Sequence, residues 1–216
     1  MTREELIKRV ALKMDEISSS DDVIVPVGTG DNNPLYTQIN NLLNESVNDA
    51  LMKAPIFRIQ NHRAVIEKDN ISVVTILDDT RKVAVIDVPE DFIRLIGIYD
   101  RMLKRPILDL AIEGDETARR QSNKFLVAKS AKPVAVIGGG QFRTITCYSY
   151  GIGDVPNPMV AYIKRYNNDS DTHADTDLDE YMIDLVSWVC AGKVFAAQGD
   201  MNKGKLCDDN AAALMV

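Results

Sequence analysis

The spacing of apolar residues changes twice along the chain, and these changes limit the folds that it can adopt. Over Leu6–Ile17 and Ile39–Ala54 the apolar residues recur at helical spacing, and the same spacing returns after Leu178. Over Ile56–Tyr166 the apolar segments are short and are separated by turn residues, as in a β domain. The sequence therefore predicts an α+β protein in which a helical bundle from both chain ends carries an inserted β domain.

Capping signals give the expected ends of the helices. Thr2–Glu5 has the form of a capping box, in which the Thr hydroxyl and the Glu carboxylate each accept a hydrogen bond from a free backbone amide. The pair Asn33–Pro34 predicts the start of a second helix, and Pro55 its end. Asp177–Glu180 predicts the start of a third helix, with acids at its positive end, and Gly199 predicts where it stops.

The central region contains eight short segments that are rich in strand-forming residues. The segment Asp78–Arg81 predicts a hairpin loop, and Gly114–Ser122 predicts a short helix. Short strands with turns between them favour an antiparallel β-sandwich or a barrel-like domain over a parallel sheet. We expect a helical domain of residues 1–55 plus 167–216 and an inserted β domain of residues 56–166. The expected strands are Ile56–Gln60, Ala64–Glu67, Ile71–Leu77, Val83–Val88, Phe92–Tyr99, Val134–Ile137, Arg143–Ser149 and Met159–Arg165.

Composition argues against several classes of function. The net charge of -7 disfavours a surface that holds nucleic acid, because such surfaces neutralise phosphates with Lys and Arg. The apolar runs are far shorter than the roughly 20 residues of a membrane span, and the mixed charges near the N-terminus do not form a secretory signal. We expect no membrane partner, a cytoplasmic location, and three cysteines that are buried thiols rather than disulfides or zinc ligands.

A run of three glycines, Gly138–Gly140, follows the apolar segment Val134–Ile137 and raises the question of a phosphate-binding loop. A dinucleotide fingerprint would need a third glycine at the position of Arg143 and a helix after it, but Thr144–Ser149 is rich in strand formers. No lysine follows the run, as it would in a Walker-type loop. The glycines therefore predict a hairpin between two strands, and we expect no cofactor.

The acidic segment Asp169–Glu180 resembles a calcium-binding loop in the spacing of its carboxylates. His173 stands at the fifth ligand position, however, and Ala174 replaces the glycine that makes the sharp turn. A solvated acidic linker that leads into a helix explains the same residues, so we expect no metal. Neither His62 nor His173 belongs to a recognisable catalytic motif. A calcium-binding or uncharacterised enzymatic module on residues 169–180 is the alternative to a non-enzymatic function.

The stretch Asp87–Ile107 carries a more specific pattern, with the sequence VPEDFIRLIGI followed after a short gap by RPI. This sequence is similar to the LPxDFLRL and RP pattern of phage head-to-tail connector proteins of the tail tubular protein A type. The segments Leu42–Ala50, Val160–Tyr166 and Leu178–Ala197 also follow the order of elements in that family. The resemblance points to the ring or adaptor proteins of short-tailed phages, including the crAss-like group.

This resemblance implies a structural virion protein that is not an enzyme. Such connectors typically assemble as rings of twelve copies beneath the portal protein, extend the DNA channel and carry the next tail or ring protein. One face of each copy meets a different face of the next copy in such a ring. An acidic protein suits a channel through which DNA passes without specific binding. We therefore expect the chain at the head-tail junction of the virion, after assembly in the host cytoplasm.

The C-terminal segment and the glycine run are the candidate partner surfaces. In connectors of this kind the terminal segment often reaches into the portal, and here it is too apolar to suit a free tail. The alternative is that it packs on its own helices; Gly204 weakens a helix there, although Ala211–Met215 would accept one. We expect the glycine run to contact a neighbouring ring. The candidate contact residues are Leu206, Leu214, Met215, Val216, Gly138, Gly139 and Gly140.

Overall fold

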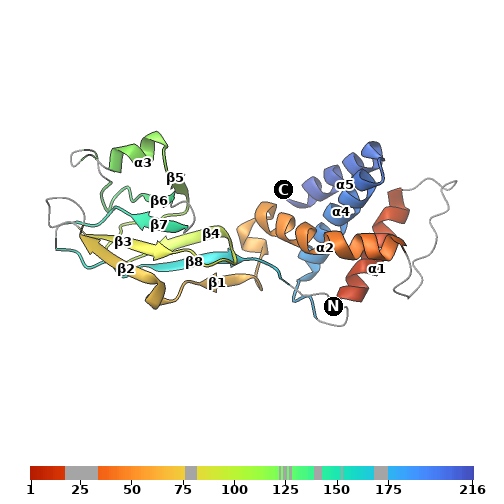
Figure 1. Ribbon diagram of the computed structural model, residues 1–216, viewed down its shortest axis with the longest axis horizontal. Helices are drawn as coiled ribbons and strands as arrows, with labels where there is room; N and C mark the ends of the chain where they lie inside the picture. Colours follow the sequence, from red (N-terminus) through yellow and green to blue (C-terminus); the bar gives the residue numbers. More distant parts are fainter. Residues whose placement is uncertain are drawn as a thin grey trace. The chain divides into compact units, whose positions relative to one another are not determined.

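The structure is a computed structural model, and it describes residues 1–17, 34–75, 82–121, 123, 126, 128–138, 143–151, 153–167 and 175–216. These residues form an α+β fold with five α-helices and two β-sheets. The chain divides into two compact units, one of residues 1–62 and 165–216 and the other of residues 63–164 (Figure 1). The first unit is helical, and the second contains both sheets and the helix α3.

Helix α4 is the central element of the helical unit. It contacts each of the three other helices, and its burial therefore extends well beyond one face. Even Ser187 and Cys190 are buried, so the helical spacing of apolar residues after Leu178 does not mark a single buried face. The helices of this unit are α1 (Arg3–Ile17), α2 (Pro34–Lys53), α4 (Glu180–Ala197) and α5 (Met201–Leu214) (Figure 1).

The start of α1 confirms the capping box. The backbone N of Thr2 donates to Glu5 Oε2 at 2.8 Å, and the backbone N of Glu5 donates to Thr2 Oγ1 at 3.3 Å. Helix α2 begins at Pro34 as expected, and Asn33, its expected cap, lies outside the described residues. Its buried side includes Ile39 and Leu43, which pack into the bundle with no exposed surface. Local signals therefore place the first two helices correctly.

The two ends of α4 illustrate one wrong and one correct prediction. The cap at its start is Asp179, which accepts a hydrogen bond from the backbone N of Met182 at 2.8 Å, and not the expected Asp177. Asp177 has a φ of 50°, which is a left-handed conformation and not the extended one of a helix cap. Asp177 therefore belongs to the segment before α4. At the other end Gly199 has a φ of 87° and closes a Schellman motif, in which the N of Asp200 donates to the Phe195 carbonyl at 2.9 Å.

The β unit contains two open sheets, and its described strands form no closed barrel. The strand order is β1-β8-β4 in one sheet and β2-β3-β7-β6-β5 in the other (Figure 1). All pairs are antiparallel except β5 with β6, which are parallel. The elements are β1 (Arg63–Val65), β2 (Ile71–Thr75), β3 (Lys82–Asp87), β4 (Phe92–Tyr99), β5 (Leu110–Ile112), α3 (Glu116–Gln121), β6 (Ala135–Gly138), β7 (Thr144–Cys147) and β8 (Met159–Lys164).

Two expectations for this region are corrected. Ile56–Arg58 is a 3-10 helix and not a strand, because the Pro55 carbonyl accepts from the backbone N of Arg58 at 2.9 Å and so extends the helical turn after α2. A wholly antiparallel arrangement also fails at β5, a strand that the sequence analysis did not identify. The chain leaves β5 through α3 and returns in β6, and such a crossover permits parallel pairing.

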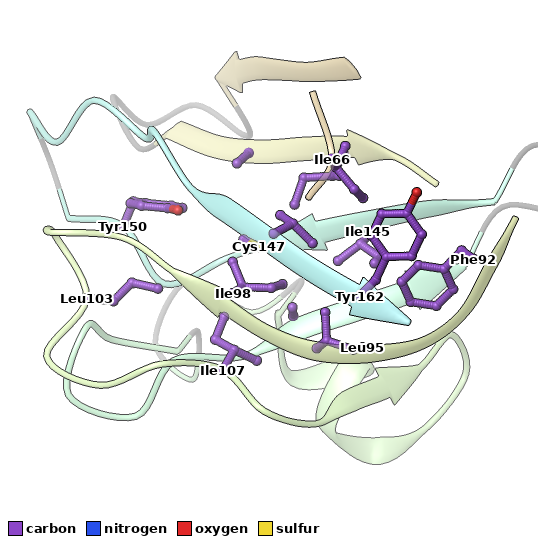
Figure 2. Close-up of a cluster of buried hydrophobic side chains, with 14 residues drawn as sticks. Ile66, Phe92, Leu95, Ile98, Leu103, Ile107, Ile145, Cys147, Tyr150 and Tyr162 are labelled. Atoms are coloured by element: carbon purple, nitrogen blue, oxygen red, sulfur yellow. The ribbon is translucent and has the colours of Figure 1, made fainter. Parts of the chain in front are cut away.

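Both sheets contribute to one hydrophobic core (Figure 2). Ile86 and Ile145 come from one sheet, and Leu95 and Ile98 come from the other. Figure 2 shows the rings of Phe92 and Tyr162 together at one end of this cluster, where they stack with centroids 5.4 Å apart. Stacked aromatic rings contribute beyond the apolar area that they bury. Residues 76–81, where the Asp78–Arg81 hairpin loop is expected, lie outside the described residues.

Candidate interaction surfaces

The C-terminal segment that the sequence left open is helix α5, which packs along α4. Asp200 caps its start by accepting from the backbone N of Lys203 at 3.1 Å. Cys207 and Ala211 are buried, and Gly204 permits the close contact with α4. A Cβ atom at Gly204 would lie 3.3 Å from the Gly192 carbonyl oxygen, which is tighter than nine in ten real contacts of this kind. The inner side of α5 is therefore part of the core.

The candidate contact residues on α5 and directly after it divide into two groups. Leu206 is 54% exposed and Val216 is fully exposed, so both present apolar atoms to solvent. Leu214 and Met215 are half-buried, and the Leu214 carbonyl accepts a hydrogen bond from the Tyr181 hydroxyl at 3.1 Å. The segment therefore packs on its own helices with one side, while the other side is exposed to solvent. Its contact with a portal protein stays a prediction.

The outer side of α5 also carries charged side chains that the sequence analysis did not single out. Leu206, Asp209 and Ala213 are exposed and are spaced three and four residues apart, which places them on one helical face. Lys205, also exposed, stands four residues before Asp209. Asp208 instead lies on the α4 side of the helix, where its carboxylate would be 3.1 Å from a Cβ atom at Gly192.

The glycine run follows β6, and the strand β7 comes after it, as the sequence predicts for a hairpin. Gly138 pairs with Thr144 of β7, while Gly139 and Gly140 lie outside the described residues. A side chain at Gly138 would overlap Glu113, whose backbone N donates to the Ile137 carbonyl at 2.9 Å. Gly138 is therefore required for the close approach of Glu113.

Most of the acidic segment, residues 168–174 with His173, lies outside the described residues. Asp175 forms an ion pair with the amino group of Met1 at 3.1 Å, and the hydrogen bond from that amino group is the main cause that lowers the pKa of this carboxyl. Asp179 caps α4. Among the residues that can be described, no group of three or more His, Cys, Asp and Glu side chains is placed to hold a metal ion. The other histidine, His62, packs edge-on against Tyr166 with ring centroids 5.9 Å apart.

All three cysteines are free and buried, as expected from their spacing. Burial raises the pKa of the Cys147 thiol to about 12 and the pKa values of Cys190 and Cys207 to about 11. A thiol is nucleophilic only as the thiolate, so these three groups are unreactive near neutral pH. No helix in the described part of the chain has both the length and the apolar character needed to span a membrane.

A groove in the β unit is a surface that the sequence analysis missed. It has a volume of about 980 Å³ and lies between the end of β4, the start of β8 and the segment around β1. Its exposed apolar lining comes from Val65, Tyr99, Met102, Val155 and Met159. These residues belong to strand ends and short loops, where isolated apolar side chains carry no periodic signal.

The stretch Asp87–Ile107 forms one continuous part of the β core. The Phe92 backbone N donates to the Pro89 carbonyl at 3.1 Å in the turn before β4, and the Asp91 carboxylate accepts from the Tyr162 hydroxyl at 3.0 Å. At the far end Ile98 and Ile107 exchange two backbone hydrogen bonds of 2.8 and 3.0 Å. The motif residues therefore form strand β4 and the segment that pairs with its end. Comparison of the chain with protein-family models and with curated protein sequences gives no significant match.

Proposed function

We propose that this chain is a structural, non-enzymatic virion protein that forms a ring at the head-to-tail junction of a short-tailed phage. The observation that carries the proposal is the stretch Asp87–Ile107. Its sequence resembles the connector pattern, and its residues have defined places in the β core. Pro89 lies in the turn before β4, Phe92 belongs to the stacked pair of rings, and Ile107 forms backbone hydrogen bonds with the end of β4. The pattern thus corresponds to one folded element and not to scattered identities.

The arrangement of helices and strands along the chain supports the same proposal. The helical unit, residues 1–62 and 165–216, is the bundle that forms the body of the ring. The inserted unit, residues 63–164, is a sandwich-like β domain. Helix α4, with α1, α2 and α5 against it, gives the body a rigid centre around which neighbouring copies can pack. Closure of heterologous contacts then sets the copy number, typically twelve in this family.

The charge of the chain supports a channel role. A net charge of -7 repels DNA weakly, so the genome passes through the ring without specific binding. Two of the basic side chains are already neutralised by acids of the helical unit. Lys193 pairs with Glu45 and Asp49 at 2.6 Å each, and Arg9 pairs with Asp184 at 2.9 Å. Lys8, Lys13 and Lys203 also form ion pairs with nearby acids.

The C-terminal end of α5 is the proposed contact with the portal protein. Val216 is fully exposed and Met215 is half-exposed, so both can enter an apolar pocket of a partner. Leu206 and Leu214 belong to the same partner surface, and Gly138–Gly140 contact a neighbouring ring. The double substitution Met215→Ser with Val216→Ser removes apolar contact area without a change in net charge. Leu12→Ser is a matched control, because Leu12 is a 60% exposed residue of α1.

The test is co-assembly with the portal protein of the same phage, measured by size-exclusion chromatography with light scattering. The native chain and the Leu12→Ser variant should elute with the portal ring, whereas the Met215→Ser, Val216→Ser variant should bind at least about tenfold more weakly, or about 1.4 kcal/mol. Circular dichroism of each variant shows whether it keeps its fold. If the native chain does not bind the portal at all, the proposed function is wrong; if the double variant binds normally, the C-terminal contact is wrong.

A further inference from the structure

We propose that strand β2 pairs with β2 of a second copy of this chain, antiparallel and about a two-fold axis at Val73. Strand β2 is the first strand of its sheet and pairs only with β3 among the described strands (Figure 1). A two-fold contact joins the same surface of both copies, whereas successive copies around a ring meet through different faces. The contact therefore joins free chains, or copies of two different rings, and is separate from the ring contact.

The other three edges of the two sheets are protected against a further strand. Strand β1 is three residues long and begins with the charged Arg63. Strand β4 has two register shifts, and Ile107 covers its end with two backbone hydrogen bonds. In β5 the backbone N of Ile112 donates to the Asp115 carboxylate at 3.2 Å, and the Ile112 carbonyl accepts from the backbone N of Asp115 at 3.0 Å. Short length, charge, irregular register and covering contacts are common ways to protect a sheet edge.

Strand β2, with the sequence ISVVT, lacks these protections within the part of the chain that the structure describes. All five of its residues pair with β3 in one continuous register, and none is charged. Val73 and Val74 lie on opposite faces of the sheet and are 44% and 45% exposed, so a further strand would cover apolar surface on both faces. A regular, uncharged and apolar edge favours pairing with another chain.

The hydrogen bonds of β3 show which backbone groups of β2 point outward. Along an antiparallel strand, alternate residues bond to the neighbour on one side and the residues between them to the neighbour on the other side. The backbone N of Val88 donates to the Arg143 carbonyl at 3.0 Å, on the β7 side. Val83 and Val85 therefore bond to β2, where their partners are Val74 and Ser72. The remaining residues of β2 direct their backbone groups away from β3.

These outward groups are arranged symmetrically about Val73. Val73 and Thr75 direct both N–H and C=O outward, while Ile71 directs its C=O outward and donates its N–H to the Lys68 carbonyl. When two copies of β2 lie antiparallel with Val73 opposite Val73, each Val73 N–H meets the Val73 carbonyl of the other copy. Each Thr75 N–H likewise meets an Ile71 carbonyl. The pair therefore satisfies the outward donors of both strands.

The side chains also fit this register. Ile71 lies opposite Thr75, Ser72 lies opposite Val74, and Val73 lies opposite its own copy, so no like charges face each other. In a second copy of the chain, β2 is also the one edge left unprotected among the described strands. Strand β2 of another copy is therefore the occupant that matches this edge in backbone direction and in charge. Because a single strand pair buries little area, the contact is weak and depends on concentration.

The first test measures self-association of the full chain, without portal, by analytical ultracentrifugation at concentrations up to about 1 mM. Val73→Lys and Val73→Glu each place like charges opposite each other at the axis, so each should weaken self-association at least about tenfold. An equimolar mixture of the two variants brings Lys opposite Glu and should restore it, which also shows that both variants keep their fold. Val65→Lys and Val65→Glu are matched controls, because Val65 is a 54% exposed valine of the edge strand β1, and they should associate as the native chain does.

Two results of this test would overturn the proposal. One is a native chain that stays monomeric over the whole range of concentration. The other is a mixture of the Val73→Lys and Val73→Glu chains that associates no better than either variant alone. Neither result depends on portal binding, so the ring proposal is tested separately.

The second test locates the two-fold axis. Opposite residues of a hydrogen-bonded antiparallel pair have Cα atoms about 5.5 Å apart, which is within reach of a disulfide. Val73→Cys should therefore form a disulfide-linked dimer in oxidised glutathione, and the three native cysteines, all buried, should not compete. Val65→Cys is the control for chance collisions, because it is at least as exposed. If Val73→Cys forms the dimer no faster than Val65→Cys, the two strands do not meet at Val73 and the proposal is wrong.

Discussion

The contact between α5 and α4 gives a sharp prediction at Gly204. This residue lies inside a helix, where glycine is usually unfavourable. A glycine is needed at this position because α5 and α4 lie very close together. A Cβ atom at position 204 would lie 3.3 Å from the Gly192 carbonyl oxygen and 3.7 Å from the backbone N of Ala196. Helix α4 cannot move away easily, because α1 and α2 pack against it. We therefore expect Gly204→Leu to force α5 outward.

The magnitude follows from two opposing effects. Leucine is a better helix former than glycine by about 0.8 kcal/mol, which stabilises α5. Overpacking a tight contact costs about 1–3 kcal/mol. The outward shift also exposes Cys207 and Ala211, which are buried at the same interface. The net loss is about 1–2 kcal/mol, and for a chain of this size each kcal/mol lowers Tm by about 2–4 °C.

The assay is thermal unfolding followed by circular dichroism, with Ala213→Leu as the control. Ala213 is exposed on the same helix, so this substitution adds the same side chain without a clash, and surface changes of this kind stay within about 0.5 kcal/mol. Gly204→Leu should unfold several degrees below both the native chain and Ala213→Leu. If Gly204→Leu is as stable as Ala213→Leu, the two helices do not approach each other closely and the reasoning is wrong.

Three further predictions concern stability. Asp179→Ala should cost about 0.5–2 kcal/mol by removing the cap of α4, whereas Asp177→Asn should cost much less, as compared by thermal unfolding. Arg3 is buried and donates to Asn40 and Asn44 at 2.7 Å each, so Arg3→Met should cost about 2–3 kcal/mol in urea unfolding and Arg3→Lys an intermediate amount. Burial raises the pKa of Cys147 from 9.0 to about 12, so its contribution is complete below pH 9.0 and is lost as the pH rises toward about 12. The urea midpoint should fall over that range, and less steeply in Cys147→Ala; an equal fall would assign the effect to other groups.

The parts of the fold that the sequence predicted correctly depend on local signals. The Thr2–Glu5 capping box, the helix start at Pro34 and the stop at Gly199 each involve backbone groups within a few residues. The strand Phe92–Tyr99 was also predicted with its observed bounds, because a turn at Pro89 precedes its alternating and apolar residues. Short-range physics determines these features, so a single sequence contains them.

The parts that were missed depend on contacts between distant segments. Strand β5 is only three residues long and forms because β6 pairs with it in parallel. Gly204 disfavours a helix when the sequence is considered alone, but a glycine is needed there because Gly192 of α4 comes so close. Asp100 has the appearance of an ordinary turn residue until Tyr150 and Asn157 are brought to it. No pattern along the chain could have identified the groove that these contacts hold open.

The most direct test of the central claim is electron microscopy of the chain mixed with its portal protein. The connector account predicts a second ring, closed and coaxial with the portal, with one copy of this chain for each portal subunit. Class averages that contain only bare portal rings, at protein concentrations where both components are folded and soluble, would contradict it.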